Sequence, residues 1–285
     1  MISLAKRNIM LFFRDRSAIF FSLLSVFIII GLYVFFLGDA WIKGFDPSMP
    51  NPEAVMGSWI MAGLLAVTSV STTMGVFGTM VDDKSRDIYK DFVSSPIKRS
   101  SLTGGYIISS YVVGMIMCLV TLVLAEAYIL YCGGELLSLT AILKVIGTLI
   151  VLNFTSTCMV MLFVTLFSSR KAFGTASTVL GTLIGFLTGI YLPIGQLPSG
   201  VQTVIKLFPI SHGAALLRQL MMEVPMSVTF ANVPAEYVKA FETELGVTLS
   251  FGDSFVTPAF SIVILLASGI LFFVLATINM SRKKS

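Results

Sequence analysis

The chain has 285 residues, of which 56% are hydrophobic and only 12% are charged, and its formal net charge is +4. In soluble globular domains about a quarter of the residues are charged, so the composition excludes a soluble domain and predicts an integral membrane protein. The three cysteines, Cys118, Cys132 and Cys158, lack the spacing of metal ligands, and we expect neither a disulfide framework nor a metal site.

Residues 1–17 have an amphipathic pattern. One helical side carries Ile2, Ala5, Ile9, Phe12 and Phe13, and the basic residues along its edge are Lys6, Arg7, Arg14 and Arg16. This pattern predicts a helix that lies on the inner leaflet of the membrane. The alternative is that the segment extends the first membrane span, which would place Arg14-Asp15-Arg16 near lipid.

Six apolar runs are long enough to cross about 30 Å of hydrocarbon. They cover residues 18–37, 54–79, 105–131, 145–168, 172–192 and 256–279. A further run, 199–222, is interrupted by Pro209 into pieces of about ten residues, too short to cross singly. The sequence therefore predicts an all-α membrane protein with six transmembrane helices and a re-entrant helical hairpin at 193–223. Residues 224–255 are polar, and we expect them to form an extracellular loop of the same single domain.

The distribution of lysine and arginine predicts the orientation. If the hairpin returns to its own side, fourteen of the 19 basic residues fall on one side, in 1–17, 80–104, 170–171 and 282–284. Basic residues accumulate on the cytoplasmic side of membrane proteins. We therefore expect a multi-pass protein of the plasma (inner) membrane with both termini in the cytoplasm.

The loop at 80–104 is the main charged segment between two spans. Ile88 and Phe92 lie one helical turn apart, as do Tyr89 and Val93, so an apolar stripe follows a short helix. Asp82 or Asp83 can cap the start of this helix, and Ser95-Pro96 ends it. An apolar stripe on a cytoplasmic helix predicts a docking site for a partner.

Two spans contain many small or hydroxylated residues. In the fifth span Ser177, Gly181, Gly185 and Gly189 recur at every fourth position, which allows another backbone to approach closely. This ridge predicts a packing or dimer surface, and the alternative is the border of a substrate pathway. The hydroxyls and glycines of the second span, including Thr68, Thr72 and Gly75, nearly encircle the helix, and we interpret this span as a candidate pathway wall.

The segment after the fifth span contains several helix breakers. We expect Pro193 to end the span, Pro198-Ser199 to start a half-helix, Pro209 to end it, and Ser211 to cap a second half-helix. His212 is the single histidine, so a hydrogen-bonded structural role is favoured over catalysis. Glu126 is the one carboxylate inside a predicted span, where it either reaches the outer headgroups or has a functional role.

Nucleotide-binding loops are absent from the sequence. Neither Gly-x-x-x-x-Gly-Lys-Ser/Thr nor Gly-x-Gly-x-x-Gly after a strand occurs. We therefore expect no ATP site or other cofactor in this chain.

The order of these elements resembles the ABC-2 type permeases of ATP-binding-cassette exporters. Phe92-Val-Ser-Ser-Pro-Ile-Lys-Arg99 is similar to the family's cytoplasmic loop that ends in Ser-Pro-x-x-Arg. Pro193 to Arg218 contains landmarks similar to those beyond the family's fifth span, namely Tyr191-Leu-Pro, Leu197-Pro, Phe208-Pro209 and Leu217-Arg218. Arg86-Asp87 departs from the glycine that many relatives carry.

The resemblance implies a type V exporter fold in a half-transporter that pairs with a like subunit, as a homodimer or heterodimer, and with separate ATPase subunits that bind Mg-ATP. It implies ATPase coupling through Asp83, Ile88, Tyr89, Phe92, Val93, Pro96 and Arg99, together with the basic residues Arg7, Arg14 and Arg16. It further implies a pathway along Thr68, Thr72, Gly75, Gly181, Gly185 and Gly189, and an outer gate with Pro193, Pro198, Pro209, His212 and Arg218.

The few internal charges favour a hydrophobic or amphipathic, drug- or antibiotic-like cargo. A lipid-linked glycan or a peptide is the alternative. Two other classes are an intramembrane enzyme, which would need further catalytic groups or metal ligands, and an ion-coupled carrier, which would need charged midplane sites.

Overall fold

The computed structural model describes residues 1–37, 41–47, 49–86, 88, 92, 94, 99–167, 169–252 and 254–282. The described chain is mainly helical and contains two short antiparallel strands, β1 (Ser250–Phe251) and β2 (Ser254–Phe255). The helices are α1 (Ile2–Arg14), α2 (Arg16–Leu32) with the π-helical turn η1 (Tyr33–Leu37), α4 (Pro52–Ser85), α6 (Arg99–Tyr131), α7 (Leu139–Thr165), α8 (Arg170–Leu187), the 3-10 turn η2 (Ile194–Gln196), α9 (Ser199–Leu207), α10 (Pro209–Met221), α11 (Glu223–Thr229), α12 (Ala235–Glu244) and α13 (Pro258–Arg282).

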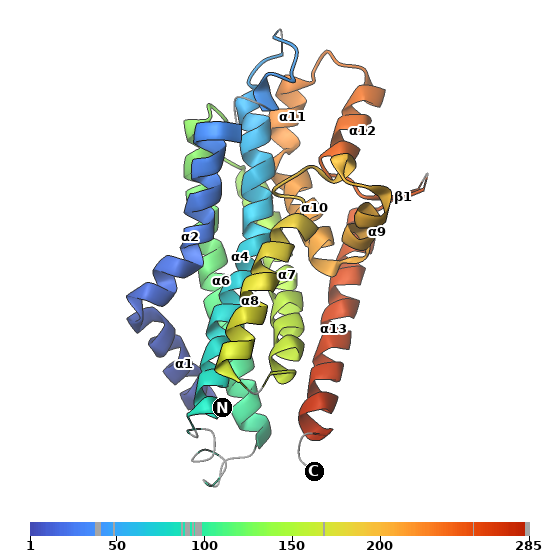
Figure 1. Cartoon of the computed structure of the whole chain (residues 1–285). Helices are drawn as coiled ribbons and strands as arrows, with labels where there is room; N and C mark the ends of the chain where they lie inside the picture. Colours follow the sequence, from blue (N-terminus) through green and yellow to red (C-terminus); the bar gives the residue numbers. More distant parts are fainter. Residues whose placement is uncertain are drawn as a thin grey trace.

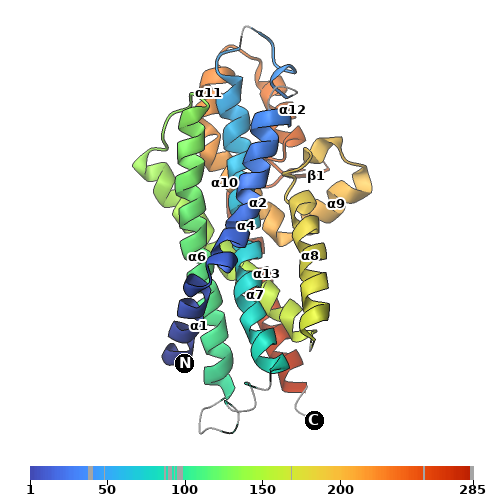
Figure 2. The same ribbon diagram turned by 60° about the vertical axis from the view of Figure 1, so that its left-hand side comes forward.

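Helix α4 is the centre of the bundle. It contacts α2, α6, α7, α8, α10 and α11, and it is buried along almost its whole length. Most of the apolar side chains of α13 are exposed, and most of those described in α2 are exposed or half-buried, as expected of helices whose outer faces contact lipid. Figures 1 and 2 show α4 enclosed by its neighbours, with α2 and α13 on opposite sides.

The start of α1 and the end of α13 lie at the same end of the bundle, which we call the proximal end (Figures 1 and 2). Helices α11 and α12 lie at the opposite, distal end. Residues 224–255, expected to be a loop, contain α12, all of α11 except Glu223, and the β1–β2 pair. The rings of Phe45, Phe230 and Phe241 pack together there, so this segment has its own aromatic contacts.

Five of the described helices are long and apolar enough to cross a membrane: α2 with η1, α4, α6, α7 and α13. Helix α8, which corresponds to the predicted fifth span at 172–192, is not among them. It begins with Arg170-Lys171 and ends at Leu187, so its apolar part is shorter than the predicted span. At 1.5 Å per residue this part is about 24 Å long, less than the hydrocarbon thickness of about 30 Å. The described helices therefore give five candidate crossings where the sequence predicts six.

Helix α1 is separate from α2, as one of the two alternatives predicts. The chain breaks at Asp15, whose carboxylate accepts hydrogen bonds from the backbone of Ser17 and Ala18 and caps α2. The buried residues of α1 are Ala5, Asn8 and Phe12, whereas Ile2 and Phe13 of the predicted apolar side are exposed. The buried side of α1 differs from the predicted apolar side because α1 packs on α6, where the hydroxyl of Ser109 is a hydrogen-bond partner for Asn8.

The segment after α8 forms two short helices, close to the predicted half-helices. Helix α9 begins at Ser199 as expected, but Pro209 is the first residue of α10, a position that needs no backbone N–H. Ser211 is therefore not a cap, and its hydroxyl donates a hydrogen bond of 2.6 Å to the carbonyl of Leu187. This bond connects α10 to the end of α8.

Candidate functional site

A groove with a volume of about 460 Å³ runs between α4 and α8. Its small and hydroxylated lining residues are Ser71, Gly75 and Gly78 of α4, and Gly174, Ser177, Thr178 and Gly181 of α8. Apolar residues including Val70, Met74 and Phe173 complete the lining, and none of the described lining residues is charged. The groove therefore offers hydroxyls and apolar surface, which suit an uncharged or amphipathic molecule.

The glycines leave the groove open. No atom lies within 4 Å of the Cβ position of Gly75 or Gly181, apart from each helix's own backbone and chain neighbours. These two residues come from spans far apart in sequence, and the structure brings them to the same groove.

The other predicted pathway residues lie elsewhere. Thr68 and Thr72 are fully buried inside the bundle and do not line the groove. Gly185 lies against the ring of Tyr191, and a Cβ atom added at Gly185 would overlap this ring. Gly189 has a φ of 65° at the turn after α8. The predicted ridge is therefore divided between the groove, a packing contact and a turn.

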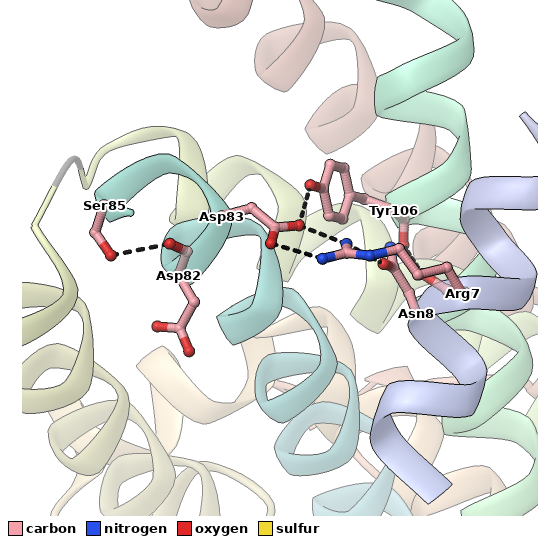
Figure 3. A network of polar contacts seen from close by, with 7 residues as sticks. Arg7, Asn8, Asp82, Asp83, Ser85 and Tyr106 are labelled. Atoms are coloured by element: carbon pink, nitrogen blue, oxygen red, sulfur yellow. Dashed lines mark hydrogen bonds and ion pairs between the residues drawn. The ribbon is translucent and has the colours of Figure 1, made fainter. Parts of the chain in front are cut away.

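A network of charged and polar side chains joins α1, α4 and α6 at the proximal end (Figure 3). The Arg7 guanidinium donates to both carboxylate oxygens of Asp83, at 2.7 and 3.0 Å, and the Tyr106 hydroxyl donates to Asp83 Oδ2 at 2.6 Å. The Asp83 side chain is only 4% exposed, and that of Arg7 is 33% exposed. The hydrogen bond to Asp83 raises the pKa of Arg7, so the guanidinium stays charged.

Two further contacts extend this network. The Asn8 side chain donates to Ser109 Oγ at 3.4 Å, and the guanidinium of Arg7 lies 5.4 Å from the ring centre of Phe92. The second contact connects α1 to the predicted coupling loop, since a cation over an aromatic face is attracted to it. An exposed pair, Arg170 with Asp82 at 3.0 Å, joins the start of α8 to the same end of α4.

The structure corrects the role expected for Asp82 and Asp83. Because α4 continues to Ser85, both residues lie in its last turns and do not start a new helix. Ile88 and Phe92 are helical and half-buried. Tyr89, Val93 and Pro96 lie outside the described residues. The remaining basic residues of the predicted set are at helix ends, with Arg14 last in α1, Arg16 first in α2 and Arg99 first in α6.

Arg218 is fully buried at the distal part of α10. Its Nη2 donates to the carbonyl of Gly189 at 3.1 Å, and its guanidinium lies 4.9 Å from the ring centre of Trp59. Trp59 in turn donates to the carbonyl of Leu245 at 2.8 Å. No carboxylate among the described residues pairs with Arg218. Arg218 and Trp59 therefore connect α4, the turn after α8 and the segment after α12.

The remaining gate residues have structural contacts. His212 Nε2 lies 2.9 Å from the carbonyl oxygen of Lys206, so it carries the hydrogen, and Nδ1 lies 3.2 Å from Ser261 Oγ. These contacts favour the structural role expected for the histidine. Pro193 and Pro198 precede η2 and α9 directly, as residues that set the backbone of a helix start.

The acidic residue Glu126 has a structural contact. Glu126 accepts a hydrogen bond of 3.0 Å from the backbone of Leu137, so its carboxylate holds the turn after α6. Within the described ranges, no group of three histidine, cysteine or acidic side chains could hold a metal ion.

Sequence reasoning missed Asn8, Trp59 and Tyr106. Asn8 interrupts the apolar side of the first helix, and Tyr106 lies at the start of the third predicted span. A polar residue at the edge of an apolar segment could have signalled a buried contact, but nothing in the sequence indicates its partner.

The fold and the groove define a mainly helical membrane protein with an uncharged groove between two of its helices. The family model described as ABC-2 family transporter protein matches residues 45–278. The chain therefore belongs to the ABC-2 family of transporter proteins and is the membrane subunit of an ABC transporter. A search of curated proteins finds no match to the chain.

Proposed function

We propose that this chain is the permease subunit of an ABC exporter that moves a hydrophobic or amphipathic, drug- or antibiotic-like molecule. The observation that carries the proposal is the uncharged groove between α4 and α8, in which glycines from both helices leave room beside hydroxyls and apolar walls. Such a surface binds apolar groups by burial and orients polar groups through few hydrogen bonds.

A second permease subunit packs against α8 in this proposal. Val179, Leu183 and Phe186 on α8 are 54%, 48% and 41% exposed and do not line the groove, so the helix retains a large apolar face outside it. Small residues on one helix allow close packing with a second helix in a membrane. The partner is either a second copy of this chain or a similar subunit.

The driving force comes from a separate ATPase subunit that binds Mg-ATP. The distribution of lysine and arginine favours a cytoplasmic proximal end, where the 80–104 loop and α1 meet. Phe92 contacts Arg7, and Arg7 is bound to Asp83 at the end of α4. A push on the loop is therefore transmitted to α1 and to the helix that forms one wall of the groove.

Purification and reconstitution test this function. The tagged chain, isolated in mild detergent from its native membrane, should bring an ABC ATPase that mass spectrometry identifies. In proteoliposomes the complex should move the amphipathic dye Hoechst 33342 in an ATP-dependent manner. The proposal fails if no ABC ATPase accompanies the chain. Transport of a lipid-linked oligosaccharide or a peptide in place of the dye would support the alternative cargoes.

A substitution in the loop tests the coupling step. Phe92→Asp should abolish association with the ATPase while the helix content stays unchanged. Phe251→Asp is a matched control, because Phe251 is an exposed aromatic residue of β1, far from the loop and from α1. Full association of the Phe92→Asp variant would exclude the loop as the coupling element.

A further inference from the structure

A cleft with a volume of about 650 Å³ lies at the distal end, and we call it the distal cleft. It is lined by Tyr33 of η1, Glu53 in the first turn of α4, Tyr128 and Tyr131 in the last turn of α6, and Cys132 directly after it, among others. Figures 1 and 2 show these helix ends together at the distal end of the bundle. The distal cleft shares no lining residue with the groove between α4 and α8.

Tyrosine rings form much of the wall of the distal cleft. Three of the eight tyrosines of the chain are among its nine described lining residues. The ring centres of Tyr128 and Tyr131 lie 6.3 Å apart. Tyrosines at a membrane boundary commonly face the lipid headgroups, but Tyr33 is only 4% exposed and lies against the cleft instead. The faces of such rings attract cations.

The charge of the distal cleft has the sign that attracts a cation. Glu53 is the one charged side chain among the described lining residues, and no hydrogen bond or ion pair within the described chain engages its carboxylate. Burial and the nearby carboxylate of Glu53 both raise the pKa of Cys132, whereas the hydrogen bond with Tyr128 lowers it. Lys43 is exposed beside Ile42 but does not line the cleft. A single carboxylate therefore stands unpaired next to aromatic rings.

The hydroxyl of Tyr33 is a second indication of a ligand. It is enclosed by the protein, and it has no hydrogen-bond partner within the described residues. The hydroxyl of Tyr128, by contrast, is paired with the thiol of Cys132. Burying a hydroxyl without a partner is unfavourable, so a ligand that brings an N–H group to this side of the cleft is favoured.

We infer that the distal cleft binds the primary ammonium group of an amphipathic amine, with the ammonium between the Glu53 carboxylate and the tyrosine rings. Val34 and Ile42, which also line the cleft, contact the apolar part of the amine. A primary ammonium has N–H donors for the carboxylate and for the Tyr33 hydroxyl, and it has a positive charge for the rings. The amine is either a free molecule or the ethanolamine headgroup of a phospholipid, because the cleft lies where three candidate spans end.

Isothermal titration of the detergent-purified chain with 2-phenylethylammonium at pH 7 tests this site. The neutral analogue 2-phenylethanol has the same apolar part and should bind at least tenfold more weakly. Glu53→Gln should weaken binding of the ammonium about tenfold, because it removes a charge-assisted hydrogen bond. Glu236→Gln removes an exposed carboxylate of α12 outside the cleft and should leave the affinity unchanged.

Two further measurements locate the ligand in the cleft. Tyr33→Phe should weaken binding about fivefold and leave the unliganded chain as stable as before, because its hydroxyl has no hydrogen bond to lose. Bound 2-phenylethylammonium should slow the reaction of Cys132 with N-ethylmaleimide, and Cys118 and Cys158 are buried and do not interfere. The inference is overturned if 2-phenylethanol binds as tightly as the ammonium, if Glu53→Gln behaves like the control, or if the labelling of Cys132 is unchanged. Wild-type affinity of Tyr33→Phe would overturn the assignment to a primary ammonium.

Native mass spectrometry with added lipids separates the two sources of the amine. Retention of dioleoyl phosphatidylethanolamine over dioleoyl phosphatidylglycerol, lost in Glu53→Gln and on addition of 2-phenylethylammonium, identifies a lipid headgroup. Equal retention of the two lipids by a chain that binds 2-phenylethylammonium identifies a free amine. No ATPase or transport is needed, so the result is independent of the proposed export function.

Discussion

The Asp83→Asn substitution removes one charge from the network that joins α1 to α4 and nearly preserves the side-chain volume. Asp83 accepts two hydrogen bonds from Arg7 and one from Tyr106, and it is almost fully buried. Breaking a fully buried ion pair costs about 3–5 kcal/mol. Because the Arg7 side chain is 33% exposed, solvent screens part of this loss, and we expect a cost of about 2 kcal/mol.

A double-mutant cycle with Arg7→Met isolates the interaction. The double variant should be more stable than the sum of the two single losses predicts, with a coupling energy of about 2 kcal/mol. Unfolding by sodium dodecyl sulfate in mixed micelles, followed by far-UV circular dichroism, measures the global free energy. Hydrogen exchange of the α1 amides measures local opening of the helix.

The Arg170–Asp82 pair is the control for this cycle. Its side chains are 60% and 33% exposed, so its coupling energy should be below about 1 kcal/mol. If the Arg7–Asp83 cycle gives no more coupling than this exposed pair, and α1 exchanges as in the wild type, the network does not hold α1 to α4.

Three further predictions concern the groove and the orientation. Gly181→Leu should stop dye transport without loss of stability, because the leucine side chain fills the groove. The control is Gly147→Leu on α7, which also has open space at its Cβ position and should leave dye transport unchanged. Gly185→Ala should destabilise the chain by about 1–3 kcal/mol in the same micelle assay, because its Cβ meets the ring of Tyr191. Cys132 alone among the cysteines should react with an impermeant maleimide added outside cells, since Cys118 and Cys158 are buried. Burial raises the pKa of Cys132, so its labelling should still accelerate above about pH 8.5, where the labelling of an ordinary thiol begins to level off. Transport by Gly181→Leu, a stable Gly185→Ala or no external labelling of Cys132 would each contradict the corresponding prediction.

Local signals in the sequence predicted most helix positions. Hydropathy located the five candidate spans, and the proline pattern located α9 and α10. Both signals are local, because the length of an apolar run and the missing backbone N–H of proline are properties of the segment itself. The fifth span was predicted too long. The turn at Gly189 depends on the contact of its carbonyl with Arg218, which is 29 residues away in the chain.

The candidate groove was only partly predictable. Gly75 and Gly181 were expected on a shared pathway, and they do line one groove. Thr68 and Thr72 were expected there too, but the hydroxyls of α4 nearly encircle the helix, and α4 is buried around nearly its whole circumference. Such a helix has no polar side that would indicate which residues face a neighbouring helix.

The sequence alone determined that the chain is a helical membrane protein, where its apolar helices lie and which end carries most of the basic residues. These properties follow from the free-energy cost of placing charged side chains and unpaired backbone groups in hydrocarbon. Each segment avoids this cost through its own amino-acid composition, so the properties can be predicted from the sequence. The tertiary structure decided that Asp83 binds Arg7 and Tyr106, that two glycine-bearing helices form a groove and that Tyr33, Glu53 and Tyr131 line one cleft. These contacts join residues distant in sequence, and their partners depend on how the helices pack.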